Sequence, residues 1–269
     1  MTGDAAANPR SVDADQPLRI EDAGINATAP REQRWIDGWL VRLSPGKAKR
    51  ARCIQPLAPG HLGIDDKLAL CLPLYAAAGL RAYVRITPFA QPSGLDDRLD
   101  ALGMRRIDDS WVMALASLGA ADRLVGSAIE PDNAVRVERV DAAAFADSVG
   151  AARGSSAEER AAHANRIAHA PVPHHAILLR DGSGTVVAGG QVVVEGALAG
   201  LYDIFTVEAA RRQGHAERVC RELLAHARAL GATTGYLQVD AGNESARSIY
   251  RRLGFRDVYA YHYRTPTVA

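Results

Sequence analysis

A basic turn stands just before one of the most regular amphipathic stretches of the sequence. Arg211, Arg212 and Gly214 precede apolar residues that recur every three or four positions, which predicts a surface helix stopped by Gly231. Cations at a helix N-terminus are unfavourable by about 0.3–1 kcal/mol unless an anion is bound there. A phosphate would engage the free N–H groups of the first turn, and a glycine lets the backbone approach it closely. The turn therefore predicts an anion site, with a solvated basic turn as the alternative.

The elements around this turn form an alternating pattern of strands and helices. Strands are predicted at residues 134–140, 174–182, 185–195, 198–208, 234–240 and 255–265. Helices are predicted at residues 141–152, 155–170, 216–230 and 243–254. The helix after the basic turn owes its apolar stripe to Ala216, Val219, Cys220, Leu223, Leu224, Ala227 and Leu230. This order predicts an α/β fold of the α+β type, with a mixed sheet and helices on both faces.

The earlier part of the chain repeats the last four of these elements. A helix beginning near Asp66 opens a helix-strand-helix-strand segment in which residues 83–86 align with 236–239 and residues 102–105 with 253–256. Two related domains in tandem are therefore expected. They would cover residues 19–126 and 127–269, behind a disordered tail at residues 1–18. The first copy lacks a basic turn before its helix, so the anion site is expected in the second domain only.

The composition limits the classes of protein that the sequence can encode. Of 269 residues, 48% are hydrophobic and 23% charged, as in soluble globular proteins, and the net charge of +1 gives no general surface for nucleic acids or membranes. No apolar run reaches the roughly 18 residues that a membrane span requires. The basic stretch at residues 44–52 lies between two strand candidates and is interpreted as a solvated hairpin turn.

Cysteines and histidines form neither a disulfide pattern nor a metal-binding pattern. Cys53, Cys71 and Cys220 are far apart and lie in apolar contexts, so they are interpreted as core residues of a cytoplasmic protein. His174 and His175 are adjacent and would point to opposite faces of a strand. No metal site is expected.

Three tyrosines alternate along the final predicted strand. Tyr259, Tyr261 and Tyr263 share one face, which is typical of a core stripe. If the stripe reaches a binding site, Tyr259 or Tyr261 would present a phenol to it.

The second half of the chain resembles the GNAT superfamily of acyl-CoA-dependent N-acyltransferases. The resemblance is carried by the turn at residues 211–216 and the strand before it, and then by Asn243, Tyr250 and the Leu-Gly-Phe sequence at residues 253–255, in the order of the family. It covers residues from about 134 to 266. The first half of the chain resembles the family only as a degenerate copy, so the resemblance implies the GNAT fold in two tandem domains.

The resemblance also implies acetyl-CoA as the acyl donor. The backbone from Gln213 to Ala216 would cradle the pyrophosphate, assisted by the two arginines, while His215 would face solvent near it. The strand before the turn would pair its backbone, around Phe205 and Val207, with the pantetheine amides, and the sheet would splay after that strand. Asn243 would cap its helix, contact CoA, or do both. The residues expected to bind acetyl-CoA are Phe205, Thr206, Val207, Arg211, Arg212, Gln213, Gly214, His215, Ala216, Asn243, Ala246 and Tyr250.

The chemistry of such a transfer points to candidate catalytic residues. A neutral amine must attack the thioester, a base must take the proton of the amine, and an acid must protonate the CoA thiolate. Tyr250 matches the family's proton donor, with core packing as the alternative. Asp203 is the first candidate for the base, acting through water, and Glu208 is the second. Strand alternation predicts one face with Asp203, Phe205 and Val207, and another with Tyr202, Ile204 and Thr206.

These observations lead to the hypothesis of a cytoplasmic N-acetyltransferase. The enzyme would move an acetyl group from acetyl-CoA to a primary amine by direct attack in a ternary complex. The first domain would complete the acceptor cleft or act as an internal dimer partner, so a monomer with an internal pseudo-dimer and a homodimer both stay open. A non-catalytic acyl-CoA-binding or protein-interaction module is the alternative, and the modest net charge disfavours an aminoacyl-tRNA or other nucleic-acid partner.

Overall fold

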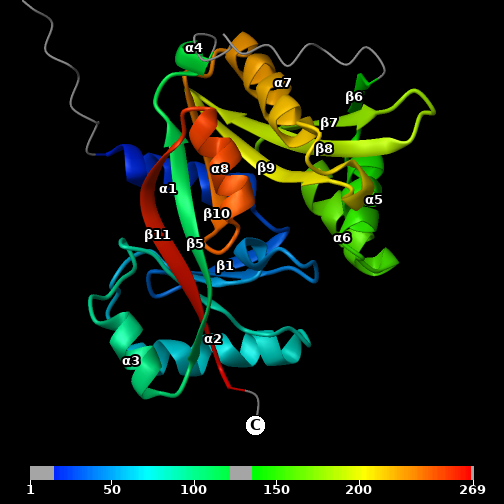
Figure 1. Ribbon diagram of the computed structural model, residues 1–269. Helices are drawn as coiled ribbons and strands as arrows, with labels where there is room; N and C mark the ends of the chain where they lie inside the picture. Colours follow the sequence, from blue (N-terminus) through cyan, green and yellow to red (C-terminus); the bar gives the residue numbers. More distant parts are fainter. Residues whose placement is uncertain (1–14, 122–134, 268–269) are drawn as a thin grey trace, which may run out of the picture.

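The computed structural model describes residues 15–121 and 135–267 of the chain. Within these ranges, eleven strands form one mixed sheet with helices on both faces (Figure 1), which confirms the predicted fold class. The strands are β1 (Glu32–Ile36), β2 (Trp39–Leu43), β3 (Ile54–Pro56), β4 (Val84–Ile86), β5 (Arg105–Leu115), β6 (Arg136–Val140), β7 (His174–Arg180), β8 (Val186–Glu195), β9 (Leu198–Thr206), β10 (Thr234–Asp240) and β11 (Arg256–Thr265). The helices are α1 (Gln16–Ala27), α2 (Ile64–Ala77), α3 (Leu95–Ala101), α4 (Leu118–Ala121), α5 (Ala142–Ala152), α6 (Ala157–Ala168), α7 (His215–Ala229) and α8 (Glu244–Arg252).

The two halves of the chain exchange their last strands within this sheet. The spatial order of the strands is β1-β2-β3-β4-β11-β5-β10-β9-β8-β7-β6. The C-terminal strand β11 pairs antiparallel with β4 and β5, and β5 pairs antiparallel with β11 and β10. Because β3 and β4 are parallel, as are β9 and β10, the arrangement on one side of the β11–β5 pair is repeated on the other. The repeat in the sequence thus corresponds to an approximate twofold relation within the sheet.

The repeated segments occupy equivalent places in the two halves. Gly103 and Gly254 follow α3 and α8, and both have a positive φ, 73° and 92°, which redirects the chain into β5 and β11. Tyr83 and Tyr236 also face the same core cluster. The expected boundary between residues 126 and 127 lies outside the described residues, as do residues 1–14 of the expected tail.

Helix α1 begins at Gln16, inside the segment that was expected to be a disordered tail. It packs Ile20, Ala23 and Ala27 against the tyrosine-rich face of the sheet. Polar residues lie between these apolar positions, and one of them, Glu21, is buried. The burial of a carboxylate hides the helical pattern from a sequence analysis based on hydrophobic periodicity.

Helices α7 and α8 cover one face of the second half of the sheet, in front of the strands in Figure 1, while α1 lies behind them. Helices α5 and α6 pack on the same face as α1, near β7 and β9. The predicted stripe of α7 is buried from Val219 to Ala227, while Ala216 at its start is partly buried and Leu230, the C-cap residue, is 48% exposed. Helices α2 and α3 pack with β2, β3 and β4 in a separate cluster.

A buried ionic group joins α1 to the region where the strands are exchanged. Arg85 of β4 forms an ion pair with Glu21, and the Tyr259 hydroxyl of β11 donates a hydrogen bond of 2.5 Å to the same carboxylate. Arg85 also lies over the ring of Tyr261, with 4.0 Å between its Cζ atom and the ring centroid. The carboxylate is therefore compensated by one cation and one hydroxyl, which makes its burial tolerable.

We predict that Glu21→Gln lowers the free energy of unfolding by about 3–5 kcal/mol, because it leaves the buried charge of Arg85 without a counter-charge. Urea denaturation followed by circular dichroism measures the change. Asp22→Asn is the matched control, since Asp22 is the next residue of α1 and is exposed. A loss below 1 kcal/mol in Glu21→Gln, on the order of the control, would contradict the structural role given to this group.

Candidate active site

The site is built around a place where two parallel strands separate. Strands β9 and β10 are paired only from Leu198 opposite Thr234 to Leu201 opposite Leu237. Beyond this point β9 continues to Thr206 and β10 to Asp240 without pairing to each other. The backbone of each strand therefore has an open edge there, which is the splay that the family resemblance implied.

A β-bulge in β9 changes which side chains share a face. Tyr202 is opposite Gln191 and Phe205 is opposite Gly189, so two residues of β9 face one residue of β8 between these pairs. Asp203 lies within the bulge and has a positive φ of 52°. The predicted alternation is therefore wrong, because Tyr202 and Phe205 share a face across the bulge. A bulge has no reliable signal in side-chain polarity, so the sequence could not reveal it.

The bulge is followed by a residue whose backbone faces the open edge. The Val207 N–H donates to the Val187 carbonyl of the β8 side, 3.0 Å away, so Val207 is not available for pairing with a ligand. In an antiparallel ladder the bonded groups alternate, so the backbone of Phe205 also points to β8 and that of Thr206 points to the opening. Thr206, and not Phe205 or Val207, therefore has its backbone groups directed toward the opening. Its Oγ1 atom is buried and has no hydrogen-bond partner among the described residues.

The basic turn lies at the N-terminus of α7, as predicted. Gly214 is the N-cap residue with a φ of 82°, and no side chain caps the helix. Arg211, Arg212 and Gln213 are exposed, and Arg212 also has a positive φ, 64°. His215 is buried, so the expectation that it faces solvent is wrong. The turn presents backbone N–H groups and two arginines to the surface beside the opening of the sheet.

Helix α8 brings three of the predicted residues to the opening. The Asn243 side chain accepts a hydrogen bond of 3.1 Å from the Ala246 N–H, which confirms its predicted role as N-cap. Tyr250 is 9% exposed and packs with Phe255 at 6.1 Å between ring centroids. Its hydroxyl has no hydrogen-bond partner among the described residues, and burial raises its pKa above the ordinary value of 10. Asn243, Ala246 and Tyr250 all line one pocket.

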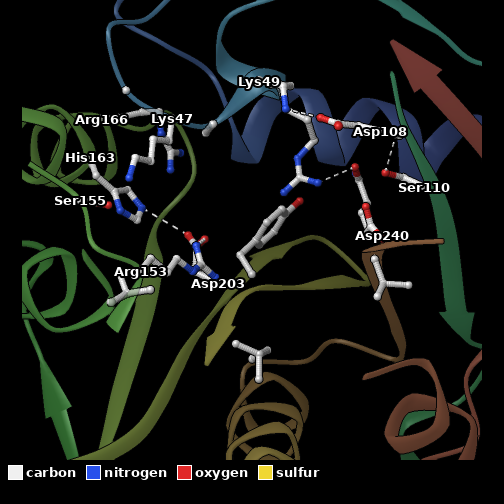
Figure 2. Close-up of a pocket in the computed structure, with 18 of the residues that line it drawn as sticks. Lys47, Lys49, Asp108, Ser110, Arg153, Ser155, His163, Arg166, Asp203 and Asp240 are labelled. Carbon is white, nitrogen blue, oxygen red and sulfur yellow. Dashed lines mark hydrogen bonds and ion pairs between the residues drawn. The ribbon is translucent and has the colours of Figure 1, made fainter. Parts of the chain in front are cut away.

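This pocket has a volume of about 440 Å³ and extends from α8 through the opening to α5 and α6 (Figure 2). Its walls come from both halves of the chain, because the loop after β2 and the strand β5 contribute to it along with β9, β10 and β11. The charged residues that line it are Lys47, Lys49, Arg50, Asp108, Arg153, Glu159, Arg166, Asp203 and Asp240, and His163 lies among them.

Asp203 lies at the centre of the pocket and is held by several groups. Its carboxylate is 2.6 Å from Arg153 Nη1 and 3.2 Å from His163 Nε2, and Gln191 donates to it at 2.8 Å. Burial opposes its ionisation, but the hydrogen bond from His163 and the charge of Arg153 outweigh it, so the pKa of Asp203 lies well below its ordinary value. A carboxylate with a depressed pKa is a weak proton acceptor, which argues against Asp203 as the general base.

Glu208, the second candidate for the base, is exposed in a short 3₁₀ segment after β9. It is not among the residues that line the pocket. The tyrosine stripe of β11 is buried as expected, but Tyr261 and Tyr263 reach the pocket while Tyr259 does not.

Several pocket residues were missed by the sequence analysis. The basic stretch at residues 44–52 is not a solvated hairpin turn, because Lys47, Lys49 and Arg50 line the pocket. His163 and Arg166 come from α6, where their three-residue spacing places them on one helix face. The signal available in the sequence was this spacing, but it is indistinguishable from that of a solvated helix face.

No group of three or more metal-ligating side chains occurs within residues 15–121 and 135–267. No helix in the described part of the chain is long and apolar enough to cross a membrane. The three cysteines are free and buried.

The fold and the opening between β9 and β10 define a GNAT-type acyltransferase. Residues 18–264 match the family model described as "Probable histone acetyltransferase Rv0428c C-terminal", so the chain belongs to this family. An uncharacterized N-acetyltransferase, YobR of Bacillus subtilis (strain 168), is 27% identical over 235 residues, covering 86% of this chain and 91% of YobR.

Solved structures share the same fold. A GCN5-related N-acetyltransferase from Kribbella flavida has a TM-score of 0.64 at 21% identity, covering 93% of this chain and 95% of its own. A tandem GNAT protein from the clavulanic acid biosynthesis pathway has a TM-score of 0.57 at 12% identity, covering 76% of this chain and 70% of its own. These similarities establish the GNAT fold across nearly the whole chain.

We predict that Asp203→Asn lowers the free energy of unfolding at pH 7 by about 1–3 kcal/mol, because charge-assisted bonds to Arg153 and His163 are lost. Since the pKa of Asp203 is depressed from 3.8, the ionised carboxylate stabilises the folded protein fully above that pH, and this stabilisation is lost as the pH falls below it. The difference in the free energy of unfolding between wild type and variant should therefore become smaller below about pH 4. Urea denaturation at a series of pH values between 7 and 3 measures this difference.

The control for this series is Asp147→Asn, which removes an exposed carboxylate from α5. The free energy of unfolding of Asp147→Asn should differ little from that of the wild type at every pH. A difference for Asp203→Asn that stays constant down to pH 3 would contradict the assigned network.

Proposed function

We propose that the protein is an N-acetyltransferase that moves an acetyl group from acetyl-CoA to a primary amine, by direct attack in a ternary complex. The observation that carries the proposal is the opening between β9 and β10. Tyr250 lines the polar pocket together with residues of α5 and α6, and the basic turn begins the helix α7 that covers the other face of the sheet. Donor and acceptor can therefore meet at one place.

Two features of the chain fit CoA. The first turn of α7 offers N–H groups next to Arg211 and Arg212, with a glycine in the left-handed conformation at the N-cap, which suits a pyrophosphate. Thr206 offers a backbone edge that β10 does not pair with, which suits the amides of pantetheine. Acetyl-CoA would supply the activated acyl thioester.

Tyr250 is proposed as the proton donor to the departing thiolate sulfur. Burial raises its pKa, so the phenol stays protonated until a stronger base develops beside it. Its hydroxyl is uncommitted to any described residue, and it lines the pocket next to Asn243 and Ala246.

His163 replaces Asp203 as the proposed base. Its Nε2 atom faces Asp203 at 3.2 Å, so the carboxylate would orient the ring and leave Nδ1 as the atom that accepts a proton. Imidazole is the side chain whose base form is ordinarily available near neutral pH. Asp203 then acts as a positioning residue, in agreement with its depressed pKa.

The two halves are proposed to form an internal pseudo-dimer in which the second half binds acetyl-CoA. Lys47, Lys49 and Arg50 of the first half line the pocket of the second, which supports a role for the first half in completing the acceptor cleft. Free, buried cysteines support a location in the cytoplasm.

Gly214→Glu should abolish acetyl-CoA binding, with at least a 100-fold loss of affinity, because it places bulk and negative charge in the phosphate cradle. Isothermal titration with acetyl-CoA measures this. Gly184→Glu is the matched control, since Gly184 has a similar φ of 85° and open space around it in the turn after β7. Wild-type protein that does not bind acetyl-CoA, or equal binding by Gly214→Glu, would refute the proposal.

Two further variants test the proton-transfer roles. We expect His163→Gln and Tyr250→Phe each to lower kcat by about 10²–10⁴-fold while acetyl-CoA binding is retained. Thiol release in the presence of a panel of primary amines is the assay. Unchanged turnover in both variants would instead favour a binding module without catalysis.

A further inference from the structure

The pocket contains a buried cation that forms no direct hydrogen bond or ion pair with a described residue. Arg166 of α6 is 8% exposed and lines the pocket, on the side of α6 seen in Figure 2. Within residues 15–121 and 135–267 its guanidinium has neither a hydrogen-bond partner nor an ion-pair partner. The nearest carboxylate of the network, Asp203, is already engaged by Arg153, His163 and Gln191. The five donors of Arg166 are therefore left to the cavity.

The other cations of the pocket differ from Arg166 because most are paired. Lys47 is 3.1 Å from Glu159, Lys49 forms an ion pair with Asp108, and Arg153 is paired with Asp203. These pairs leave no surplus charge for a ligand.

Arg50 adds a second cation without a carboxylate partner. Its Nη1 atom donates to Gln238 at 2.8 Å and to the Tyr261 hydroxyl at 3.4 Å. Its Cζ atom lies 5.6 Å from the ring centroid of Tyr202. The partners of Arg50 are therefore neutral, and its positive charge adds to that of Arg166 in the same cavity.

Behind this wall, the protein interior adds further positive charge. Arg42 is fully buried and donates only to neutral oxygens, those of Thr28, Ile25 and Arg50. Arg42 does not line the pocket, but its charge repels that of Arg166, which favours an anion beside Arg166. Asp240, the lining carboxylate outside the ion pairs of the pocket, comes from the end of β10 and not from α6. The cavity is thus complementary to an anion on the side of α6.

We propose that the amine acceptor carries a compact oxyanion, such as a carboxylate, and that Arg166 binds it with assistance from Arg50. This inference rests on the proposed acetyltransferase function and names the class of its second substrate. A planar guanidinium binds carboxylate or phosphate oxygens through paired hydrogen bonds, so the site selects amino acids or similar amines over plain amines.

The anion is a different one from the phosphates of CoA. None of residues 211–216 lines this pocket, and α7 covers the face of the sheet opposite to α6. A lysine-rich peptide is also a poor match, because it would bring cations toward Arg166 and Arg50. The acceptor class is therefore an anionic amine and not a polycationic protein tail.

The test uses matched pairs of acceptors with the full-length protein saturated with acetyl-CoA. Glycine, β-alanine, 4-aminobutyrate and 6-aminohexanoate are compared with alkylamines of the same chain length, and aminoalkylphosphonates and a lysine-rich peptide complete the panel. Calorimetry gives binding and thiol release gives turnover. At least one anionic amine should bind 10-fold or more tightly than its uncharged counterpart, and phosphonates distinguish a general oxyanion site from one specific for carboxylate.

Arg166→Gln should remove this preference, with a loss of about 10- to 100-fold in affinity for the anionic amine and unchanged affinity for acetyl-CoA. Arg166→Lys should retain part of the preference for the anionic amine. The control is Arg136→Gln, which removes the same charge from an exposed position on β6. Equal binding, or no binding, by both members of every pair overturns the inference, as does tighter binding of the lysine-rich peptide. Failure of the wild type to bind acetyl-CoA would instead overturn the proposed function.

Discussion

The whole site depends on one departure from regular pairing, the separation of the parallel strands β9 and β10 beyond Leu201 and Leu237. Backbone groups inside a sheet are normally satisfied by the neighbouring strand. Here they are left open over the last residues of β9, and the bulge at Asp203 lies within this unpaired part of the strand. A ligand with amide groups can take the place of the missing strand. The turn of α7 and the residues of α8 matter because they lie beside this opening.

The exchange of β5 and β11 makes the opening part of a larger unit. Because β5 pairs with β10, the first half of the chain supports the strand that forms one side of the opening. The same exchange brings β11 and the loop after β2 next to the pocket, so the first half contributes charge to a site whose proposed donor-binding elements belong to the second half. Buried groups such as Glu21 and Arg85 stabilise this arrangement by joining α1 to the exchanged strands.

The sequence was informative where local rules decide the structure. The glycine and arginines of the α7 turn, the Asn243 cap and the repeat at Gly103 and Gly254 all depend on neighbouring residues, and they could be predicted. The sequence could not predict that Tyr202 and Phe205 share one face of the sheet, because a bulge in β9 shifts the alternation of side chains by one residue. The pairing of Asp203 with His163 and the place of Arg166 depend on how α6 packs against a sheet formed by both halves.

The central claim is that the opening of β9 together with the α7 turn binds acetyl-CoA. Hydrogen–deuterium exchange of the wild type, with and without saturating acetyl-CoA, measures this directly at the backbone. Slower exchange at residues 203–206 and 213–217, with no change at β3 (Ile54–Pro56), the strand of the first half that corresponds to β9, is the result that we expect. Unchanged exchange at both segments, or protection confined to the first half, would contradict the account.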